Sequence, residues 1–413
     1  LIPASNQKLL TAAASLNALG AAYQFETVIA ADSAPDAEGA VDSLYLRGSG
    51  DPTLTSEQFW RLSADLRRKG LRRVRGDLIL DDSIFDRVAW NPAWGKVSTR
   101  AYHSPVGGVS ANYGSFAVEV SPGVSAGSPA RVALDPPISY FTVSSQAVTG
   151  KPGSRSRPSV DRMALPANKE GQVRDKITVT GSIAAGADSR TVYRSVSDPL
   201  YYAGGLWKMQ LEANGITVEG QVRRGVAPET VHELMAFEGF PLSEVVQRFV
   251  KYSNNSIAES LLKVLGARAT GQAGTWGNGI VALRSQLESL GIDVSSLVTE
   301  DGSGLSRNNR VSPRTFVQTL RVADRSFAWG PELIAALPIA GMDGTLEKRA
   351  NGAVGSVRAK TGLLTGVTGL SGFVHARDGD GMIFSILVND YPQGDQAAMN
   401  AVDRFVEALV HAE

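Results

Sequence analysis

Apolar residues recur at helical spacing near the start of the chain. The stripe runs from Leu9 onward and ends at Gly20, which predicts a helix with Ser5 in its first turn. Residues 241–251 and 257–264 repeat the same period. The polar residues between these two segments are therefore expected to form a short turn that joins two helices.

The C-terminal part of the chain changes to the pattern of strands and closes with a helix. The helix is expected from about residue 395 to residue 411. A hairpin turn is expected at residues 378–381. The strands are expected at residues 355–362, 369–376 and 382–389.

Between about residue 35 and residue 234 the sequence is mostly strand-like and rich in glycine, serine and valine. It contains one clear helix, at residues 56–69, and a loop at residues 150–158. A chain of 413 residues also exceeds what one hydrophobic core usually supports. We therefore expect an α+β multidomain protein. Its parts would be a helix-rich domain of residues 1–34 and 235–413, an inserted β-rich domain of residues 35–119 and 193–234, and a nested β subdomain of residues 120–192.

The composition narrows the range of functions. The 41 basic and 41 acidic residues balance, which argues against a nucleic-acid partner. The chain has 4 scattered histidines, no cysteine, and no Gly-x-Gly-x-x-Gly or phosphate-loop motif. The sequence therefore implies neither a metal nor a nucleotide cofactor. No apolar run reaches the roughly 18 residues of a membrane span.

One basic cluster lies in the inserted region and has two possible interpretations. It comprises Arg61, Arg67, Arg68, Lys69, Arg72, Arg73 and Arg75. A solvated helix-and-turn surface is the simpler interpretation and the one that we favour. Peripheral contact with an anionic wall polymer or membrane surface is the alternative.

Three short motifs carry the candidate chemistry. A serine nucleophile whose general base is a lysine needs both side chains on one helical face, and a spacing of three residues supplies that. An amide-bearing turn and a lysine on a strand would complete a site for acyl transfer. The motifs are Ser5-x-x-Lys8, Ser253-x-Asn255 and the triplet Lys360-Thr361-Gly362.

Each motif is short, and the chain contains decoys. A second Ser-x-x-Lys, at Ser260 and Lys263, falls inside a predicted helix, where a core or solvent-facing role is expected. Ser-x-Asn occurs four times, whereas Lys-Thr-Gly occurs once. Context distinguishes the chosen set, because Ser5 opens a helix, Ser253 lies in a turn and Lys360 lies on a strand.

The nucleophile and its base impose conditions on their surroundings. In a first helical turn the backbone N–H of Ser5 has no partner within the helix and can face a developing oxyanion. The backbone N–H of Leu363 would be the second oxyanion donor. Lys8 can act as the base only when neutral, and lowering its pKa from about 10.4 to near 7 requires roughly 4–5 kcal/mol. Burial and a second cation, for which Lys360 is the candidate, would provide this.

The remaining motif residues are expected to hold the substrate. Lys360 and Thr361 would bind a substrate carboxylate in a charge-assisted contact. Asn255 could orient an amide, and Ser253 could relay a proton to the leaving nitrogen. Gly362 would let a ligand approach the strand closely, because a side chain there would block the cleft.

In this order the three motifs are those of penicillin-interacting enzymes. The chain resembles, essentially end to end, the low-molecular-mass class C penicillin-binding proteins, the D-alanyl-D-alanine carboxypeptidases and endopeptidases of the penicillin-binding protein 4 type. The 248 positions from Ser5 to Ser253 match the long insertion of that family, whereas class A β-lactamases have a far shorter gap. Further stretches that carry the resemblance are Leu46–Leu54, Gly76–Leu78, Asp301–Ser306 and Gly341–Leu346.

The resemblance implies a penicilloyl-serine transferase fold, in which helices flank an antiparallel sheet, with a large β-rich insertion. It implies a serine DD-peptidase that hydrolyses the terminal D-Ala-D-Ala bond, or D-Ala cross-links, of peptidoglycan through an acyl-enzyme on Ser5. The other catalytic residues would be Lys8, Ser253 and Asn255. Peptidoglycan peptides would be the substrate, β-lactams would inhibit, and the protein would be exported to the periplasm or the cell wall.

Two alternative functions remain open. A β-lactamase would use the same nucleophile, and a non-catalytic wall-binding protein could share the fold. The family also carries helix and strand before its nucleophile, whereas only four residues precede Ser5 here. We expect that the sequence is truncated at this point, because an unpaired sheet edge and an uncovered apolar face would be costly.

Overall fold

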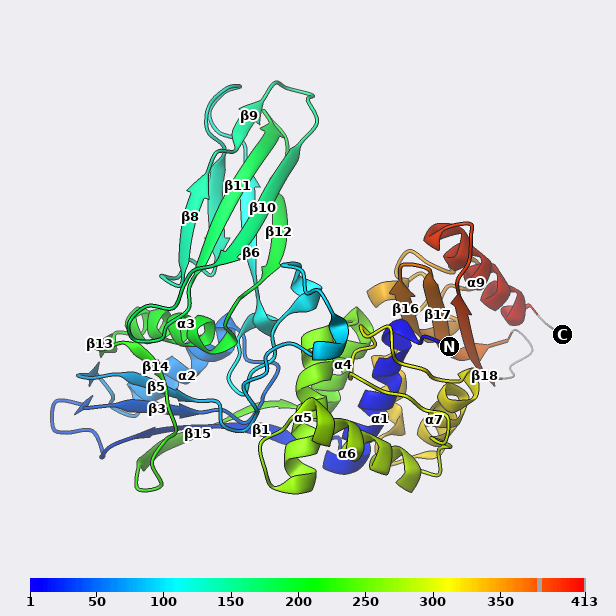
Figure 1. The fold of residues 1–413 in the computed structure, drawn as a ribbon, viewed down its shortest axis with the longest axis horizontal. Coiled ribbons are helices and arrows are strands. Elements are labelled where there is room, and N and C mark those ends of the chain that lie inside the picture. Colours follow the sequence, from blue (N-terminus) through cyan, green and yellow to red (C-terminus); the bar gives the residue numbers. More distant parts are fainter. Residues whose placement is uncertain (377–380, 412–413) are drawn as a thin grey trace. The chain divides into compact units, whose positions relative to one another are not determined.

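The computed structural model describes residues 1–376 and 381–411. The hairpin turn expected at residues 378–381 therefore lies almost entirely outside the described residues. The chain divides into two compact units, whose elements are labelled in Figure 1. The first unit comprises Leu1–Phe25, Asn91–Lys96 and Phe240–Glu413, and the second comprises Glu26–Trp90 and Val97–Gly239. All residues of the three motifs belong to the first unit.

The first unit contains a three-stranded antiparallel sheet with the order β16-β17-β18. The strands are β16 (Val357–Leu364), β17 (Val367–His375) and β18 (Gly381–Asn389), and they begin and end within two residues of the predicted positions. Alternate strand residues such as Leu370 and Val374 share a core with Val406 of helix α9 (Asp395–Val410). Helix α9 lies along the sheet in Figure 1 and packs on β17. This arrangement confirms the predicted antiparallel sheet with flanking helices.

The other helices of the first unit surround α1 (Gln7–Leu19). Every residue from Gln7 to Leu16 is buried, so α1 is a central helix rather than a surface helix. Its neighbours are α4 (Leu242–Tyr252), α5 (Asn255–Thr270), α6 (Trp276–Ser289) and α7 (Pro313–Arg325). The short elements of the unit are α8 (Gly330–Ala336) and the 3-10 turns η1 (Ala4–Asn6), η2 (Pro92–Trp94), η5 (Gly344–Leu346) and η6 (Asn351–Ala353).

The second unit is rich in strands and includes two helices, α2 (Ser56–Arg68) and α3 (Pro199–Ala213). Its sheets have the orders β14-β5-β3-β1-β15, β13-β4-β2, β12-β6-β7 and β10-β11-β8, with β9 paired to β11. The strands are β1 (Gln24–Ala31), β2 (Ala40–Val41), β3 (Leu44–Arg47), β4 (Arg73–Val74), β5 (Leu78–Asp81), β6 (Ser115–Ser121), β7 (Arg131–Asp135), β8 (Phe141–Ser145), β9 (Val148–Gly150), β10 (Arg157–Ala164), β11 (Asp175–Ala184), β12 (Arg190–Ser195), β13 (Thr217–Val218), β14 (Val222–Arg224) and β15 (His232–Pro241).

Strands β6 to β12 occupy the region expected to form a nested subdomain at residues 120–192. They form sheets of their own, which extend away from the five-stranded sheet in Figure 1. Their buried residues Val160 and Ile177 nevertheless belong to the same core cluster as Ile29 and Leu46 of the five-stranded sheet. A separate nested subdomain therefore stays a prediction.

The segment Asn91–Lys96 differs from the predicted domain boundaries. The sequence pattern predicts this segment in the inserted domain, whereas in the structure it belongs to the first unit. Asn91 Nδ2 donates to Glu300 O at 2.6 Å, and Trp94 Nε1 donates to Asp301 Oδ2 at 2.8 Å. These long-range hydrogen bonds have no local sequence signal, which explains the difference.

Candidate active site

The first motif spans η1 and the start of α1, with Ser5 in η1 and Lys8 in the first turn of α1. Ala4 has a left-handed backbone with φ of 45°, a conformation that is costly for a non-glycine residue and is often found at functional turns. Gly304 makes room for this turn, because a Cβ at that position would collide with Ala4 O. Ser5 is half-buried and Lys8 is fully buried. Lys8 Nζ lies 3.1 Å from Ser5 Oγ, so the expected pair is within hydrogen-bond distance.

The Lys8 amine is surrounded by oxygen atoms. Nζ lies 2.6 Å from Asn255 Oδ1 and 2.8 Å from Ser303 O. Burial lowers the pKa of Lys8 to about 7, and the negative charges of Asp301 and Glu259 oppose part of this effect. The site therefore holds a lysine that can exchange a proton near neutral pH.

The turn between α4 and α5 carries the second motif. Ser253 ends α4 with a left-handed backbone of φ 59°, and the Asn254 side chain caps α5. Asn255, the first residue of α5, faces Lys8. Ser253 instead accepts a hydrogen bond from Lys360 Nζ at 3.0 Å. This turn therefore places one side chain against each of the two motif lysines.

Lys360 lies on β16 and is fully buried. Its Nζ also donates to Thr361 O at 2.8 Å. Burial lowers the pKa of Lys360 well below its usual value, and the positive charge of Lys8 adds to this effect. The lowered pKa of Lys8 is due to burial. The expected second cation, Lys360, is thus present. The repulsion between the two lysines lowers the pKa of Lys360, whereas the pKa of Lys8 is lowered by burial.

Gly362 has a packing role that the sequence did not predict. A Cβ at this position would lie 2.5 Å from Asn6 Nδ2 and 2.8 Å from Pro3 O. Gly369 of β17 pairs with Gly362 of β16 and also has no room for a side chain, because a Cβ there would lie 2.6 Å from Asn6 Nδ2. The two glycines therefore let the sheet pack closely against η1 and so fix the position of Ser5. This packing is one reason for glycine at position 362, and the blocking of the cleft by a side chain there stays a prediction.

The end of β16 also brings in a residue that the sequence analysis did not select. Thr361 Oγ1 lies 2.8 Å from Thr345 Oγ1 of η5, so two hydroxyl groups meet beside Lys360. Thr345 belongs to the Gly341–Leu346 stretch noted above, which was its only signal in the sequence. The Leu363 side chain is exposed.

A buried carboxylate behind Lys8 is a second residue that the sequence analysis missed. Glu259 Oε1 accepts Ser303 N at 2.7 Å, and Oε2 accepts Gly302 N at 3.2 Å and Trp276 Nε1 at 2.7 Å. Burial raises the pKa of Glu259 to about 7, and the charge of Asp301 adds to this effect. Glu259 therefore holds the backbone segment whose Ser303 carbonyl contacts Lys8.

Asp301 anchors the other end of the same loop. Its Oδ1 accepts Gly304 N and Asn309 Nδ2, both at 2.8 Å. Its Oδ2 accepts Ser306 N at 2.6 Å and the Trp94 indole N–H. The Asp301–Ser306 stretch is thus a loop held from both ends by buried carboxylates, which gives a physical reason for its Asp-Gly-Ser-Gly sequence.

The decoy pair Ser260 and Lys263 lies inside α5, as predicted. Both side chains are buried in α5. The Lys263 ammonium lies 3.7 Å from the centre of the Trp276 ring. This position agrees with the core role expected for the pair.

Two further observations bear on the kind of site. Within residues 1–376 and 381–411, no three His, Cys, Asp or Glu side chains gather closely enough to hold a metal ion. Of the helices in this described part, none is both long enough and apolar enough to cross a membrane.

Comparisons with known proteins agree with this geometry. The model of the D-Ala-D-Ala carboxypeptidase 3 (S13) family matches residues 1–410. A D-alanyl-D-alanine carboxypeptidase of Actinomadura sp. (strain R39) is 40% identical over 408 residues, which cover 95% of this chain and 74% of that protein. The D-alanyl-D-alanine carboxypeptidase DacB of Haemophilus influenzae is 29% identical and covers 96% of this chain and 82% of its own length.

A solved structure extends the comparison to the fold. The crystal structure of penicillin-binding protein 4 from Haemophilus influenzae matches with a TM-score of 0.82 at 27% identity, over 100% of this chain and 92% of that chain. The predicted fold class and enzyme class are thereby confirmed. The chain belongs to the D-Ala-D-Ala carboxypeptidase 3 (S13) family, as its three motifs indicated.

Proposed function

We propose that this chain is a serine DD-peptidase of peptidoglycan with Ser5 as its nucleophile. Ser5 Oγ attacks the carbonyl carbon of the penultimate D-Ala, the terminal D-Ala leaves, and water then hydrolyses the acyl-enzyme. The observation that carries this proposal is the position of the buried Lys8, whose Nζ lies 3.1 Å from Ser5 Oγ and whose pKa is about 7. Such a lysine can take the serine proton at neutral pH.

The three neighbours of Lys8 Nζ can also accommodate the neutral amine that the mechanism requires. A neutral amine has two N–H groups and one lone pair, whereas an ammonium has three N–H groups. Asn255 Oδ1 and Ser303 O can only accept, so they take the two N–H groups. The lone pair then faces the Ser5 hydroxyl, which can donate to it. Lys8 would receive this proton as Ser5 bonds to the substrate carbon.

The leaving nitrogen needs a proton when the peptide bond breaks. Ser253 is the proposed proton donor. Lys360, whose Nζ lies 3.0 Å from Ser253 Oγ, would in turn give a proton to this hydroxyl. The negative oxygen of the tetrahedral intermediate would be stabilised by the backbone N–H groups of Ser5 and Leu363. Asn255 would hold the substrate amide while it keeps Lys8 in place.

The substrate carboxylate is proposed to lie against the end of β16. Thr361 and Thr345 present hydroxyl groups there, and the buried Lys360 supplies a positive charge behind them. An incoming carboxylate would favour the charged form of Lys360 and oppose the lowering of its pKa. This arrangement accounts for a preference for peptides with a free C-terminus.

The rate of acylation by penicillin is expected to rise with pH through about 7 and to level off above it. Lys8 acts only when neutral, and its pKa is about 7, so the rate should fall about tenfold for each pH unit below that value. Burial lowers this pKa, and the negative charges of Asp301 and Glu259 raise it. Lys360 is the other charged group that faces Lys8. Rapid-quench mass spectrometry between pH 5.5 and 9 would measure it. A rate that is constant over this range would contradict the role of Lys8.

Replacing Glu259 with glutamine is expected to lower the acylation rate by about 10- to 100-fold. Glutamine offers one acceptor oxygen to three N–H donors, so the backbone at Ser303 must move, at a cost of about 1.5–3 kcal/mol. The negative charge that raises the pKa of Lys8 is also lost. The pH at which the rate is half-maximal should therefore move to a lower value.

Asp403→Asn provides the matched control for Glu259→Gln. It removes a partly buried carboxylate that pairs with Arg349 Nη2 at 2.7 Å, away from the motifs. We expect normal acylation in this variant. A Glu259→Gln enzyme with a lower plateau and an unmoved half-maximal pH would reduce Glu259 to a structural role.

The finer points of the proposal concern location and substrate. We propose that the protein is exported and works in the periplasm or at the cell wall, since its substrate lies there. Cleavage of D-Ala cross-links would use the same atoms, with a side-chain amine as the leaving group.

A β-lactamase remains the alternative if penicillin is turned over quickly, and a non-catalytic wall-binding protein remains the alternative if Ser5 is never acylated.

A further inference from the structure

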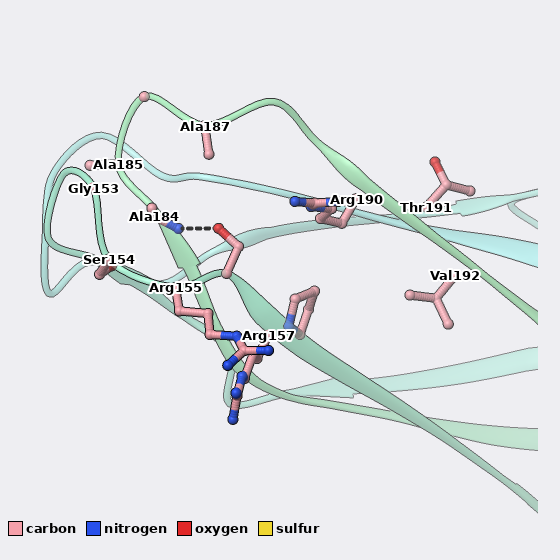
Figure 2. A pocket seen from close by; sticks show the side chains of 13 residues that line it. Gly153, Ser154, Arg155, Arg157, Ala184, Ala185, Ala187, Arg190, Thr191 and Val192 are labelled. Atoms are coloured by element: carbon pink, nitrogen blue, oxygen red, sulfur yellow. Dashed lines mark hydrogen bonds between the residues drawn. The ribbon is translucent and has the colours of Figure 1, made fainter. Parts of the chain in front are cut away.

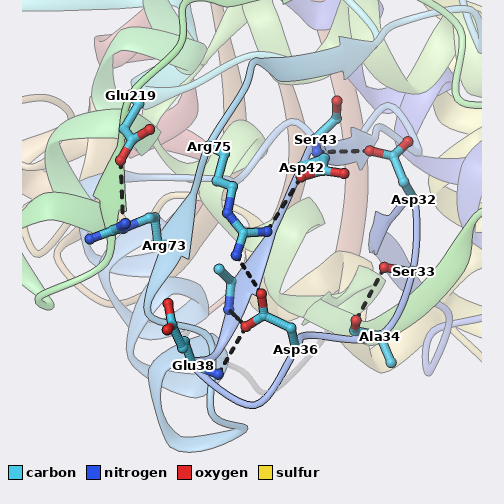
Figure 3. Close-up of polar contacts among 11 residues, drawn as sticks. Asp32, Ser33, Ala34, Asp36, Glu38, Asp42, Ser43, Arg73, Arg75 and Glu219 are labelled. Carbon is cyan, nitrogen blue, oxygen red and sulfur yellow. Dashed lines mark hydrogen bonds and ion pairs between the residues drawn. The ribbon is translucent and has the colours of Figure 1, made fainter.

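Three of the seven residues of the basic cluster of the second unit, Arg68, Arg73 and Arg75, form ion pairs with carboxylates. Figure 3 shows Arg75 paired with Asp36 and with Asp42, the latter at 3.4 Å. It also shows Arg73 Nε at 3.5 Å from Glu219. These ion pairs support the favoured interpretation of the cluster as a solvated surface.

Three other arginines of the same unit surround a single cavity without such partners. The cavity has a volume of about 810 Å³ and lies between residues 153–158 and residues 184–192 (Figure 2). Arg155 lies in the loop before β10, Arg157 is the first residue of β10, and Arg190 is the first residue of β12. All three are exposed. In the described part of the chain, none of the three guanidinium groups forms an ion pair or a hydrogen bond.

The residues that line the cavity leave the charges of the three arginines unbalanced. None of the 13 lining residues is acidic, and the others are glycine, serine, alanine, proline, threonine and valine. Asp188 belongs to the segment 184–192, two residues before Arg190, but does not line the cavity. Like charges around one cavity repel one another, and an anion in the cavity would relieve that repulsion. Arginine also binds carboxylate and phosphate groups with two parallel hydrogen bonds.

We propose that this cavity is a binding site for an anionic saccharide polymer that carries carboxylate or phosphate groups. The cavity is concave and large enough for a sugar residue with its substituents, and its small side chains leave the floor accessible. A membrane surface fits less well, because none of the lining residues is aromatic or a large aliphatic residue that could enter a bilayer. A single-stranded nucleic acid fits less well, because the wall has no aromatic side chain for base stacking.

The site would hold the protein on the wall polymer that surrounds its substrate. The choice of a wall polymer rests on the proposed function, whereas the anion site rests on the cavity alone. The two claims can therefore fail separately. Polymer binding and acylation by penicillin are measured independently on the same samples.

The test measures binding of the full chain to two defined probes, oligogalacturonate for carboxylates and oligo(glycerol phosphate) for phosphates. The triple variant Arg155→Gln, Arg157→Gln, Arg190→Gln is expected to bind the preferred probe at least about tenfold more weakly, with a smaller dependence on salt. The control triple variant Arg100→Gln, Arg131→Gln, Lys169→Gln removes the same charge from the same unit outside the cavity. It is expected to change the affinity by less than about twofold.

Four results would overturn the proposal. In the first, the wild type binds neither probe. In the second, both triple variants bind equally weakly, and in the third, the cavity variant binds as well as the wild type. In the fourth, the wild type binds only to vesicles that contain phosphatidylglycerol. Both triple variants should be acylated by penicillin at the normal rate, which shows that the first unit is folded, and should give the wild-type circular dichroism spectrum, which reports on the strands of the second unit. A wild-type protein that binds a probe but is not acylated would contradict the proposed function and leave the anion site intact.

Discussion

Replacing Lys8 with methionine is expected to lower the rate of acylation by penicillin by about 10²- to 10⁴-fold, the contribution typical of a positioned general base. Methionine has a similar length and no charge, so it can occupy the buried position without an unpaired ammonium. It cannot accept the Ser5 proton. Asn255 Oδ1 and Ser303 O lose their donor, so a moderate loss of stability should accompany the loss of activity.

The Lys8→Met result needs a control that separates chemistry from stability. Lys208→Met is suitable, because Lys208 Nζ also donates to two oxygen atoms, Val218 O at 2.8 Å and Gly220 O at 2.9 Å. It lies in α3 of the second unit. Its variant should lose some thermal stability and keep its acylation rate. A Lys8→Met enzyme that retains more than a tenth of the wild-type rate would show that another group is the base.

Amidating the C-terminal carboxylate of a D-Ala-D-Ala peptide is expected to lower kcat/KM by at least about 30-fold. Removing one partner of a buried, hydrogen-bonded charge pair costs about 2–5 kcal/mol, and the lower limit corresponds to this factor. The charge on the protein side is that of Lys360, with Thr361 and Thr345 beside it. Peptides that differ only in the terminal group would be compared by release of the last residue.

The same pair of peptides can test Thr361 directly. In a Thr361→Val enzyme the acid should be cleaved more slowly, whereas the amide should be cleaved at nearly the wild-type enzyme's rate for the amide. The difference between the two peptides should therefore shrink. Equal activity of the wild type on acid and amide would refute the carboxylate site at the end of β16.

The sequence predicted the local parts of the site well, because each depends on short-range patterns. Helical spacing placed Lys8 one turn from Ser5, and the break between two apolar stripes placed Ser253 in a turn. The strand pattern placed Lys360 on β16. The roles assigned to these residues are not tested by the structure and remain predictions for the experiments above.

The parts that the sequence did not predict depend on contacts between distant segments. Glu259 is separated from Ser303 by 44 positions, and nothing in the helical pattern of α5 distinguishes its carboxylate from one that faces solvent. Asn91–Lys96 joins the first unit through hydrogen bonds that span about two hundred positions. Gly362 was recognised as necessary, but its neighbours Pro3 and Asn6 could be identified only in the folded chain.

Helix α3 of the second unit was not predicted from the sequence. Residues 193–234 were expected to belong to a β-rich insertion, yet Pro199–Ala213 is helical. Most of its residues are buried on several sides, so the helix lacks the polar face that marks a helix in sequence. The start signals were present, since Asp198 accepts the N–H groups of the first turn and Pro199 follows it.

The intact mass of the protein after exposure to benzylpenicillin tests the central claim most directly. The wild type should gain the mass of one penicillin molecule per chain, and the adduct should persist for longer than the mixing time. The Ser5→Ala variant should show no adduct. An adduct that persists in Ser5→Ala, or a wild type that gains no mass whether or not it consumes the drug, would contradict the assignment of Ser5 as the nucleophile of a DD-peptidase.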